Sequence, residues 1–207
     1  MSLSISKIVL RTSVFWAFLL CMVPMSVLAH DAAERAKEID AKKEKMIWRA
    51  IDDPKSKVNW GEVDAIIDQP VEKVVEVLRA YEGYRYFLPF FTGSSVEKKL
   101  GTTAIVRLKA KILNGTVTLR TRVMATEEDK QGKTHRFTLR LMSGNVKRLD
   151  ANWNVTPIDE KRTLVTFGLI VDPDLWMVPN SKLSNYNLVN VRRTVRSLRK
   201  HLAKKKR

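Results

Sequence analysis

The stretch from residue 67 to residue 91 reads IDQPVEKVVEVLRAYEGYRYFLPFF and decides how the chain folds. Pro70 suits the first turn of a helix, and apolar residues follow it at helical spacing (Val71, Val74, Val75 and Leu78). Six of the chain's sixteen aromatic residues then fall within eleven positions, from Tyr81 to Phe91. Aromatic side chains bury large areas, so this cluster either caps a core or walls a pocket.

After the cluster, apolar and polar residues alternate over several short segments. The dipeptide Asn114-Gly115 lies between two of them and is typical of a tight hairpin turn. A period of two predicts antiparallel strands with one apolar face and one solvated face. Two further extended segments precede the helix. The expected strands lie within residues 46–51, 57–67, 105–112, 117–125, 136–141, 149–155 and 165–171.

The residues from about Ser181 onward predict one long helix, because apolar side chains recur every three or four positions. Its apolar stripe needs a partner, and the apolar face of the sheet is available. We therefore expect an α+β fold, in which a curved antiparallel sheet wraps around a long C-terminal helix and a short helix follows the first strand. The stripe consists of Leu188, Val191, Val195, Leu198 and Leu202.

The N-terminus has the pattern of a secretory signal peptide. Lys7 and Arg11 precede an apolar run, and Val27-Leu28-Ala29 is a small-residue cleavage pattern. We expect cleavage after Ala29; the alternative is an uncleaved anchor of 18 residues that begins at Thr12. Both readings export the rest of the chain, and we expect it in the periplasm.

The predicted mature chain has 178 residues, no cysteine, and 36 basic against 22 acidic residues. Disulfides, thiolate catalysis and cysteine metal sites are thereby excluded, and one domain with a packed core is expected. The net charge of +14 favours polyanionic partners or anionic membranes.

Residues 30–45 have almost no apolar face, so we expect an exposed helix or a flexible lead there. We divide the chain into a signal peptide (1–29), an N-terminal helix or lead segment (30–56), a domain (57–203) and a basic tail (204–207).

Four short motifs follow one another along the chain: residues 67–74 (IDQPVEKV), 84–89 (YRYFLP), 153–157 (WNVTP) and Asp172-Pro173. With the order of strand, helix, aromatic turn, strands and long helix, they resemble the START-like helix-grip superfamily (SRPBCC), and within it the polyketide cyclase/dehydrase and coenzyme Q-binding branch. The resemblance covers about residues 58–203. It implies a helix-grip fold with an internal cavity, between helix and sheet, that receives a hydrophobic ligand.

The aromatic turn and the loop before the last helix are candidates for the rim through which such a ligand enters. The alternative is that these side chains plug the end of the grip and leave no void. The expected partner is a hydrophobic small molecule such as a quinone, a phospholipid or a polycyclic lipid. The candidate pocket or rim residues are Tyr84, Tyr86, Phe87, Phe90, Phe91, Trp153, Trp176, Met177, Leu188, Val191 and Val195.

A second candidate surface is basic. If the strands pair in order, their solvated faces form one positive sheet face, and each engaged Lys or Arg contributes up to ~1 kcal/mol against an anionic lipid surface. The alternative is a solvated face without a dedicated partner. Export and the lack of an RNA-binding motif argue against nucleic acid, and the oligomeric state is not indicated. The candidate contacts are Arg107, Lys109, Lys111, Arg120, Arg122, Lys204, Lys205, Lys206 and Arg207.

The sequence offers no catalytic constellation. None of the three histidines, His30, His135 and His201, has a partner at motif spacing, and the common nucleophile, metal and phosphate motifs do not occur. We therefore predict no catalytic residue, no metal and no cofactor. Three functions stay open: a carrier of a hydrophobic molecule, which we favour, a cyclase-type enzyme that acts by shaping its substrate, and an adaptor that uses its basic face without binding a ligand.

Overall fold

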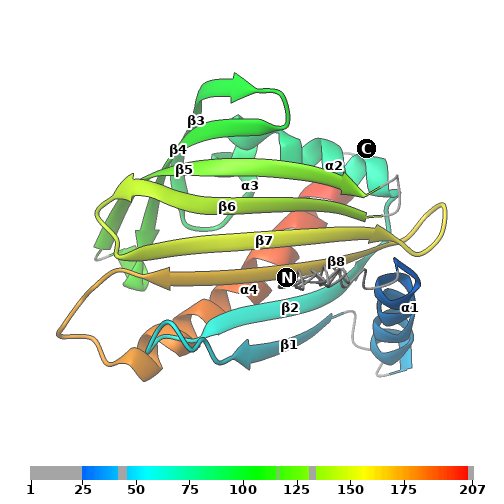
Figure 1. Ribbon diagram of the computed structural model, residues 1–207, viewed down its shortest axis with the longest axis horizontal. Coiled ribbons are helices and arrows are strands. Elements are labelled where there is room, and N and C mark those ends of the chain that lie inside the picture. Colours follow the sequence, from blue (N-terminus) through cyan, green and yellow to red (C-terminus); the bar gives the residue numbers. More distant parts are fainter. Residues whose placement is uncertain (1–24, 42–45, 116, 131–133, 205–207) are drawn as a thin grey trace, which may run out of the picture.

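Eight antiparallel strands form one curved sheet, and a long C-terminal helix lies against one of its faces (Figure 1). The computed structural model describes residues 25–41, 46–115, 117–130 and 134–204; most of the predicted signal peptide, residues 1–24, lies outside this range. The sheet order is β1-β2-β8-β7-β6-β5-β4-β3. The strands are β1 (Met46–Ile51), β2 (Trp60–Ile67), β3 (Phe91–Leu100), β4 (Thr103–Ile112), β5 (Val117–Lys130), β6 (Thr134–Gly144), β7 (Arg148–Pro157) and β8 (Thr163–Asp172).

The predicted helix-grip architecture is confirmed. The strands from β3 to β8 pair in chain order, and β2 joins the last of them, with Ala65 opposite Val165. This pairing brings the first part of the domain beside its last strand, and α4 packs against both β2 and β8. The helical elements are α1 (Met25–Ala41), α2 (Val71–Arg79), η1 (Tyr81–Gly83), α3 (Tyr84–Phe87), η2 (Leu113–Gly115) and α4 (Asn180–Lys204).

The helix α4 packs closely on β2 at Gly61. A Cβ atom at this position would stand 2.6 Å from the backbone carbonyl carbon of Asn187, so only glycine permits the approach. Most of the predicted apolar stripe of α4 is buried in the core. The buried stripe residues are Val191, Val195, Leu198 and Leu202.

The N-terminal segment forms the helix α1, as one of the two expected alternatives had it, but this helix is not exposed on all sides. Ala36 and Ile39 are buried and pack against Ile66 and Leu164 on the outer face of the sheet. These two helix residues lie three positions apart, which places them on one side of a helix. Two apolar residues are enough for a narrow contact, although they give the sequence no visible apolar face.

Two strands lie outside the segments that we assigned to the sheet of the domain. The edge strand β3 was not predicted, because its sequence FTGSSVEKKL has little apolar alternation and most of its side chains are exposed. The strand β1 was expected as an extended segment and pairs with β2. The sheet therefore begins at Met46, upstream of residue 57, where we placed the start of the domain.

Candidate ligand-binding cavity

An apolar cavity of about 70 Å³ lies between the sheet, α4 and the aromatic turn. Of its eighteen lining residues, fifteen are apolar or aromatic, including Tyr84, and the other three are Thr or Asn. The strands β4 to β8 contribute alternate residues, because every second side chain of a strand points to the same face of the sheet. The interior of the grip is therefore not completely filled by side chains.

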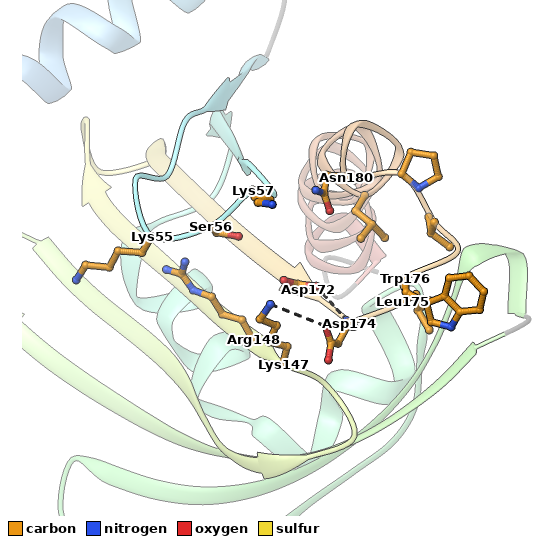
Figure 2. Close-up of a pocket in the computed structure, with 13 residues that line it drawn as sticks. Lys55, Ser56, Lys57, Lys147, Arg148, Asp172, Asp174, Leu175, Trp176 and Asn180 are labelled. Carbon is orange, nitrogen blue, oxygen red and sulfur yellow. Dashed lines mark hydrogen bonds and ion pairs between the residues drawn. The ribbon is translucent and has the colours of Figure 1, made fainter.

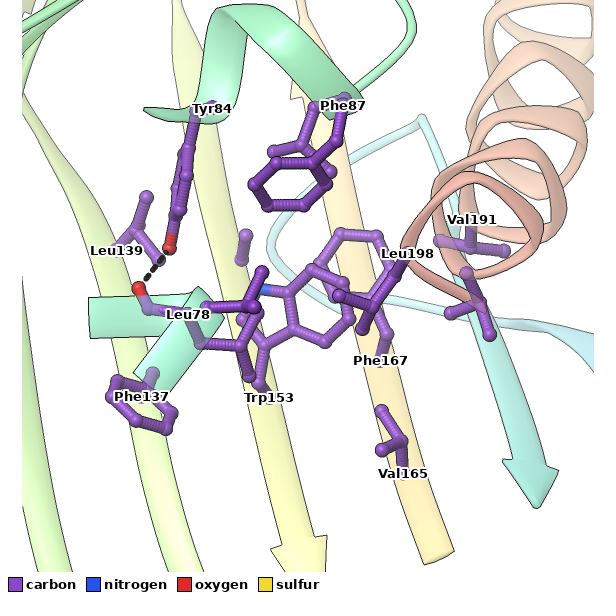
Figure 3. Close-up of a cluster of buried hydrophobic side chains, with 14 of the residues drawn as sticks. Leu78, Tyr84, Phe87, Phe137, Leu139, Trp153, Val165, Phe167, Val191 and Leu198 are labelled. Carbon is purple, nitrogen blue, oxygen red and sulfur yellow. Dashed lines mark hydrogen bonds between the residues drawn. The ribbon is translucent and has the colours of Figure 1, made fainter. Parts of the chain in front are cut away.

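Tyr84 forms a rigid part of the cavity wall. Its side chain is 1% exposed, and its hydroxyl donates a hydrogen bond to the Leu78 carbonyl oxygen at 2.8 Å (Figure 3). Edge-on contacts with Tyr81 and Phe87, at ring-centroid distances of 5.6 and 5.7 Å, fix the ring further. Burial raises the pKa of Tyr84 well above its usual value, so the phenol stays protonated and remains a donor.

Trp153 and Phe167 form another part of the lining. They face each other on the paired strands β7 and β8, and their rings stack at a centroid distance of 3.8 Å. Figure 3 shows the aromatic turn pointing toward this pair, while α4 flanks it with Leu198 and Val191. Large stacked aromatics give the cavity an apolar surface that a flat or branched hydrocarbon can contact.

Phe90 belongs to the aromatic turn and lies beside α4, at the edge of the cavity. Its ring centroid is 6.1 Å from that of Tyr186, and the guanidinium of Arg193 lies 6.0 Å from it. The backbone of Phe90 has φ = 108°, a conformation that is strained for a residue with a side chain. Strain of this kind persists only where the surroundings impose it. We therefore regard Phe90 as the candidate gate of the cavity, that is, the residue that moves to admit a ligand.

The cavity is too small for a lipid in this structure. Its volume of about 70 Å³ is far below the roughly 300–1,000 Å³ of pockets that bind small organic ligands. A lipid-sized molecule therefore enters only after side chains around the cavity move. Phe90 is half-exposed and strained, so its displacement is less costly than that of the buried wall residues.

Three polar side chains interrupt the apolar lining: Thr121 of β5, and Asn190 and Thr194 of α4. The sequence reasoning missed them because it followed only apolar residues along the last helix. The signal was present, since Asn187, Asn190 and Thr194 fall at spacings of three and four on the buried side of α4. Extending the stripe to polar residues would have found Asn190 and Thr194, but not Thr121 on β5.

The predicted pocket residues fall into three groups. Tyr84, Phe90, Phe91 and Trp153 line the cavity together. Phe87, Val191 and Val195 are buried in the surrounding core without lining the cavity, and Leu188 is half-buried on α4. Tyr86, Trp176 and Met177 are 71%, 92% and 75% exposed and lie away from it.

The predicted basic face exists as a geometric arrangement. In the register of β4 and β5, Arg107 lies opposite Arg122 and Lys109 opposite Arg120, and all four side chains are exposed. Glu97 of β3 binds both Arg107 and Arg122, with contacts of 2.6 Å, and partly neutralises this face. Lys111 and Lys204 are exposed as well, while Lys205, Lys206 and Arg207 lie outside the described residues.

A separate open depression of about 710 Å³ lies at the N-terminal end of α4 (Figure 2). Lysine side chains from two directions border it, Lys55 and Lys57 from the β1–β2 connection and Lys147 from the turn before β7. Lys147 lies 3.8 Å from Asp174. Trp176 borders the same depression and is almost fully exposed, so a basic surface and a large apolar side chain stand side by side there.

In the part of the chain that the structure describes, no three His, Cys, Asp or Glu side chains stand close enough to bind a metal ion. Within that same part, every helix is too short or too polar to cross a bilayer. Of the described residues that line the cavity, Tyr84 alone has an ionisable side chain, and its hydroxyl donates a hydrogen bond to the Leu78 carbonyl oxygen. The cavity thus presents an apolar surface with a few neutral polar groups.

A curved sheet, a long C-terminal helix and an apolar cavity between them define a START-like protein, a class whose members bind lipids or other hydrophobic small molecules. The family model described as polyketide cyclase / dehydrase and lipid transport matches residues 61–203, and the chain belongs to this family. The suspected superfamily is thereby confirmed. A search of curated proteins gives no match.

Solved structures agree on the fold. A STAR-related lipid transfer protein (fragment 25–204) from Xanthomonas axonopodis has a TM-score of 0.66 and 17% identity, over 77% of this chain and 94% of that one. Human StAR-related lipid transfer protein 5 has a TM-score of 0.67 at 10% identity, over 88% and 100%. The Zhui aromatase/cyclase from Streptomyces sp. R1128 has a TM-score of 0.60 at 13% identity, over 78% and 97%. Similarity at such low identity shows a common fold.

Proposed function

We propose that the protein is an exported carrier that encloses a hydrophobic small molecule, such as a quinone, a phospholipid chain or a polycyclic lipid, in the cavity between sheet and α4. The apolar lining of that cavity is the observation that carries the proposal. A 16-carbon chain gains about 13 kcal/mol on leaving water, at ~0.8 kcal/mol per methylene. A carrier that crosses an aqueous compartment must therefore enclose its cargo.

The N-terminal sequence pattern supports the export part of this proposal. Residues 1–29 combine basic residues, an apolar run and a small-residue cleavage pattern. The predicted cleavage point after Ala29 falls within α1, whose buried residues Ala36 and Ile39 lie downstream of it. Cleavage there would leave the packed part of α1 in the mature protein, and we propose a periplasmic location.

Transient docking on an anionic membrane is a further part of the proposal. The exposed Trp176 and Met177 supply the apolar anchor, and the lysines around the neighbouring depression supply attraction to anionic headgroups. The basic face of β4 and β5 adds long-range attraction but carries no exposed aromatic residue. A few engaged lysines at up to ~1 kcal/mol each give reversible binding, which suits a carrier that must release its cargo.

A cyclase is the second candidate, because the family description includes polyketide cyclases and one structural neighbour is an aromatase/cyclase. Acid–base catalysis needs a positioned ionisable group near the substrate. Tyr84 is the one such group among the described lining residues, and its hydroxyl already donates to Leu78. A carrier therefore fits this lining better than an enzyme does.

Native mass spectrometry tests the carrier proposal. The protein is purified from its own membrane compartment, and separately incubated with vesicles of phosphatidylethanolamine and phosphatidylglycerol that contain ubiquinone. We expect a bound hydrophobic molecule in at least one of the two samples. Recovery of the bare protein alone from both samples would refute the proposal.

Two variants assign the binding to the cavity. Ala151 lines it, so Ala151→Leu puts additional side-chain volume inside it and should abolish uptake. Such overpacking costs about 1–3 kcal/mol of stability, so circular dichroism must show that this variant is folded. Ala50 is exposed on the edge strand β1, and the matched variant Ala50→Leu should bind as the wild type does. Equal uptake by both variants would place the ligand elsewhere.

A further inference from the structure

Asn190 is a buried polar residue that the fold does not satisfy. Its side chain is on the inward face of α4, lines the apolar cavity, and is 3% exposed. Its side-chain oxygen, Oδ1, has no hydrogen-bond partner. A buried polar group without a partner is destabilising, and native structures contain few of them. Asn190 therefore requires an explanation beyond the packing of α4.

Asn187, one helical turn earlier, shows what a structural asparagine looks like in this helix. Its Oδ1 accepts a hydrogen bond from the Val171 N–H at 3.2 Å, and its amide nitrogen donates one to the Asn59 carbonyl oxygen at 3.1 Å. These bonds fasten α4 to β8 and to the start of β2. Asn190 makes no comparable connection, so its carboxamide is free to serve a molecule in the cavity.

The remainder of the lining limits what that molecule can be. The described lining residues include no Lys, Arg or His and no carboxylate, so a phosphate or a fatty-acid carboxylate in the cavity would lose its hydration without gaining an ionic partner. A neutral hydroxyl both donates and accepts hydrogen bonds, and so does a carboxamide. A hydroxyl thus matches Asn190, and the apolar body of the same molecule matches the other walls.

We propose that Asn190 is the polar anchor of the cavity and that the ligand is a neutral apolar molecule with a hydroxyl group, bound with the hydroxyl toward α4. This inference rests on the proposed carrier function and narrows its ligand class to alcohols and phenols. Asn152 on β7 provides a matched control, because its Oδ1 also has no hydrogen-bond partner but its side chain does not line the cavity.

Three related probes test the assignment. The probe 2-naphthol both donates and accepts hydrogen bonds, 2-methoxynaphthalene only accepts them, and 2-methylnaphthalene neither donates nor accepts them. Their affinities are measured by titration of tryptophan fluorescence for the full chain and for Asn190→Leu and Asn152→Leu. The readout is the affinity ratio of 2-naphthol to 2-methylnaphthalene, because the ratio cancels general changes in the cavity. We expect this ratio to fall about tenfold in Asn190→Leu, the value of a lost hydrogen bond, and to change less than twofold in Asn152→Leu.

Thermal unfolding without probe provides a second readout. Asn190→Leu should melt at or above the wild-type temperature, since an unpaired buried amide is replaced by an apolar side chain. A marked fall in melting temperature would show that Asn190 is structural and would overturn the inference. An unchanged probe ratio in Asn190→Leu, or 2-methoxynaphthalene binding as tightly as 2-naphthol, would overturn it as well while leaving the carrier function intact. No binding of any probe would overturn the inference about Asn190, and the mass-spectrometry experiment then decides separately whether the protein is a carrier.

Discussion

Replacement of the strained Phe90 by glycine and by alanine tests whether the gate is held in an unfavourable backbone conformation. A non-glycine residue at an unfavourable φ costs roughly 1–3 kcal/mol, and alanine at φ = 108° retains this strain whereas glycine does not. Glycine loses roughly 0.5–1 kcal/mol through its more flexible unfolded state. We therefore expect Phe90→Gly to be about 1 kcal/mol more stable than Phe90→Ala, the reverse of the usual order.

Urea unfolding followed by circular dichroism measures this difference directly. Both variants lose the same ring, so their comparison isolates the backbone term. Phe91 lines the same cavity without a positive φ and serves as the control, for which alanine should exceed glycine in stability by ~0.5–1 kcal/mol. If Phe90→Ala proves as stable as Phe90→Gly or more stable, the strain attributed to Phe90 is not present.

The same two variants report on ligand release. The ring of Phe90 contributes about 0.5–1.5 kcal/mol through Tyr186 and about 0.5–1 kcal/mol through Arg193, so its removal should ease opening by about 1–2.5 kcal/mol. This corresponds to roughly 5- to 70-fold faster release of bound 2-naphthol in a stopped-flow displacement experiment. A release rate equal to that of the wild type would show that the ligand leaves by another route.

Three further predictions concern separate parts of the molecule. The pKa of Asp53 is lowered, chiefly by the hydrogen bond from the Lys55 N–H, so the stabilising effect of the ionised Asp53 carboxylate should be lost as the pH falls below about 4. In urea titrations, Asp53→Asn should be less stable than the wild type at pH 7 and should not show this loss of stability in acid. Trp176→Ser should reduce co-sedimentation with phosphatidylglycerol vesicles and not alter the melting temperature; unchanged binding would remove this loop from the docking surface. Tyr84→Phe leaves the buried Leu78 carbonyl oxygen without its partner and should lower the free energy of unfolding by about 1–3 kcal/mol, whereas an unchanged value would mean that water replaces the hydroxyl.

The sequence predicted the architecture well because strong periodicity reports burial. The alternation in β4 to β8 and the apolar spacing in α4 each describe an element with one face in the core, and such elements have few ways to assemble. Elements with weak periodicity were predicted less well, because few of their side chains are buried. The edge strand β3 is held by backbone pairing to β4, and α1 is held by Ala36 and Ile39 together with ion pairs such as Arg35 to Asp64, which no apolar pattern records.

The cavity was predicted as a region but not residue by residue. The aromatic cluster does wall it, yet α3 turns by about 100° per residue, so Tyr84 points inward and Tyr86 points to solvent. Trp176 was grouped with the rim because of its aromatic character, but it stands exposed on the loop before α4. Which side of a short turn faces inward depends on the packing of its neighbours, and a pattern of residue types does not contain that information.

The two unfavourable features of the cavity meet at one short segment of α4, because Phe90 contacts this segment and Asn190 belongs to it. Phe90 is strained where it contacts Tyr186 and Arg193, and the unsatisfied Asn190 lies between these two positions along the helix. A hydroxylated ligand would satisfy the carboxamide, and its volume would displace Phe90 from the strained conformation. The free energy lost in the closed, empty form would then be recovered on binding, because a ligand stabilises the state that it contacts best. If the ligand acts in this way, its loading and the opening of the cavity are coupled through residues 186–193 of α4.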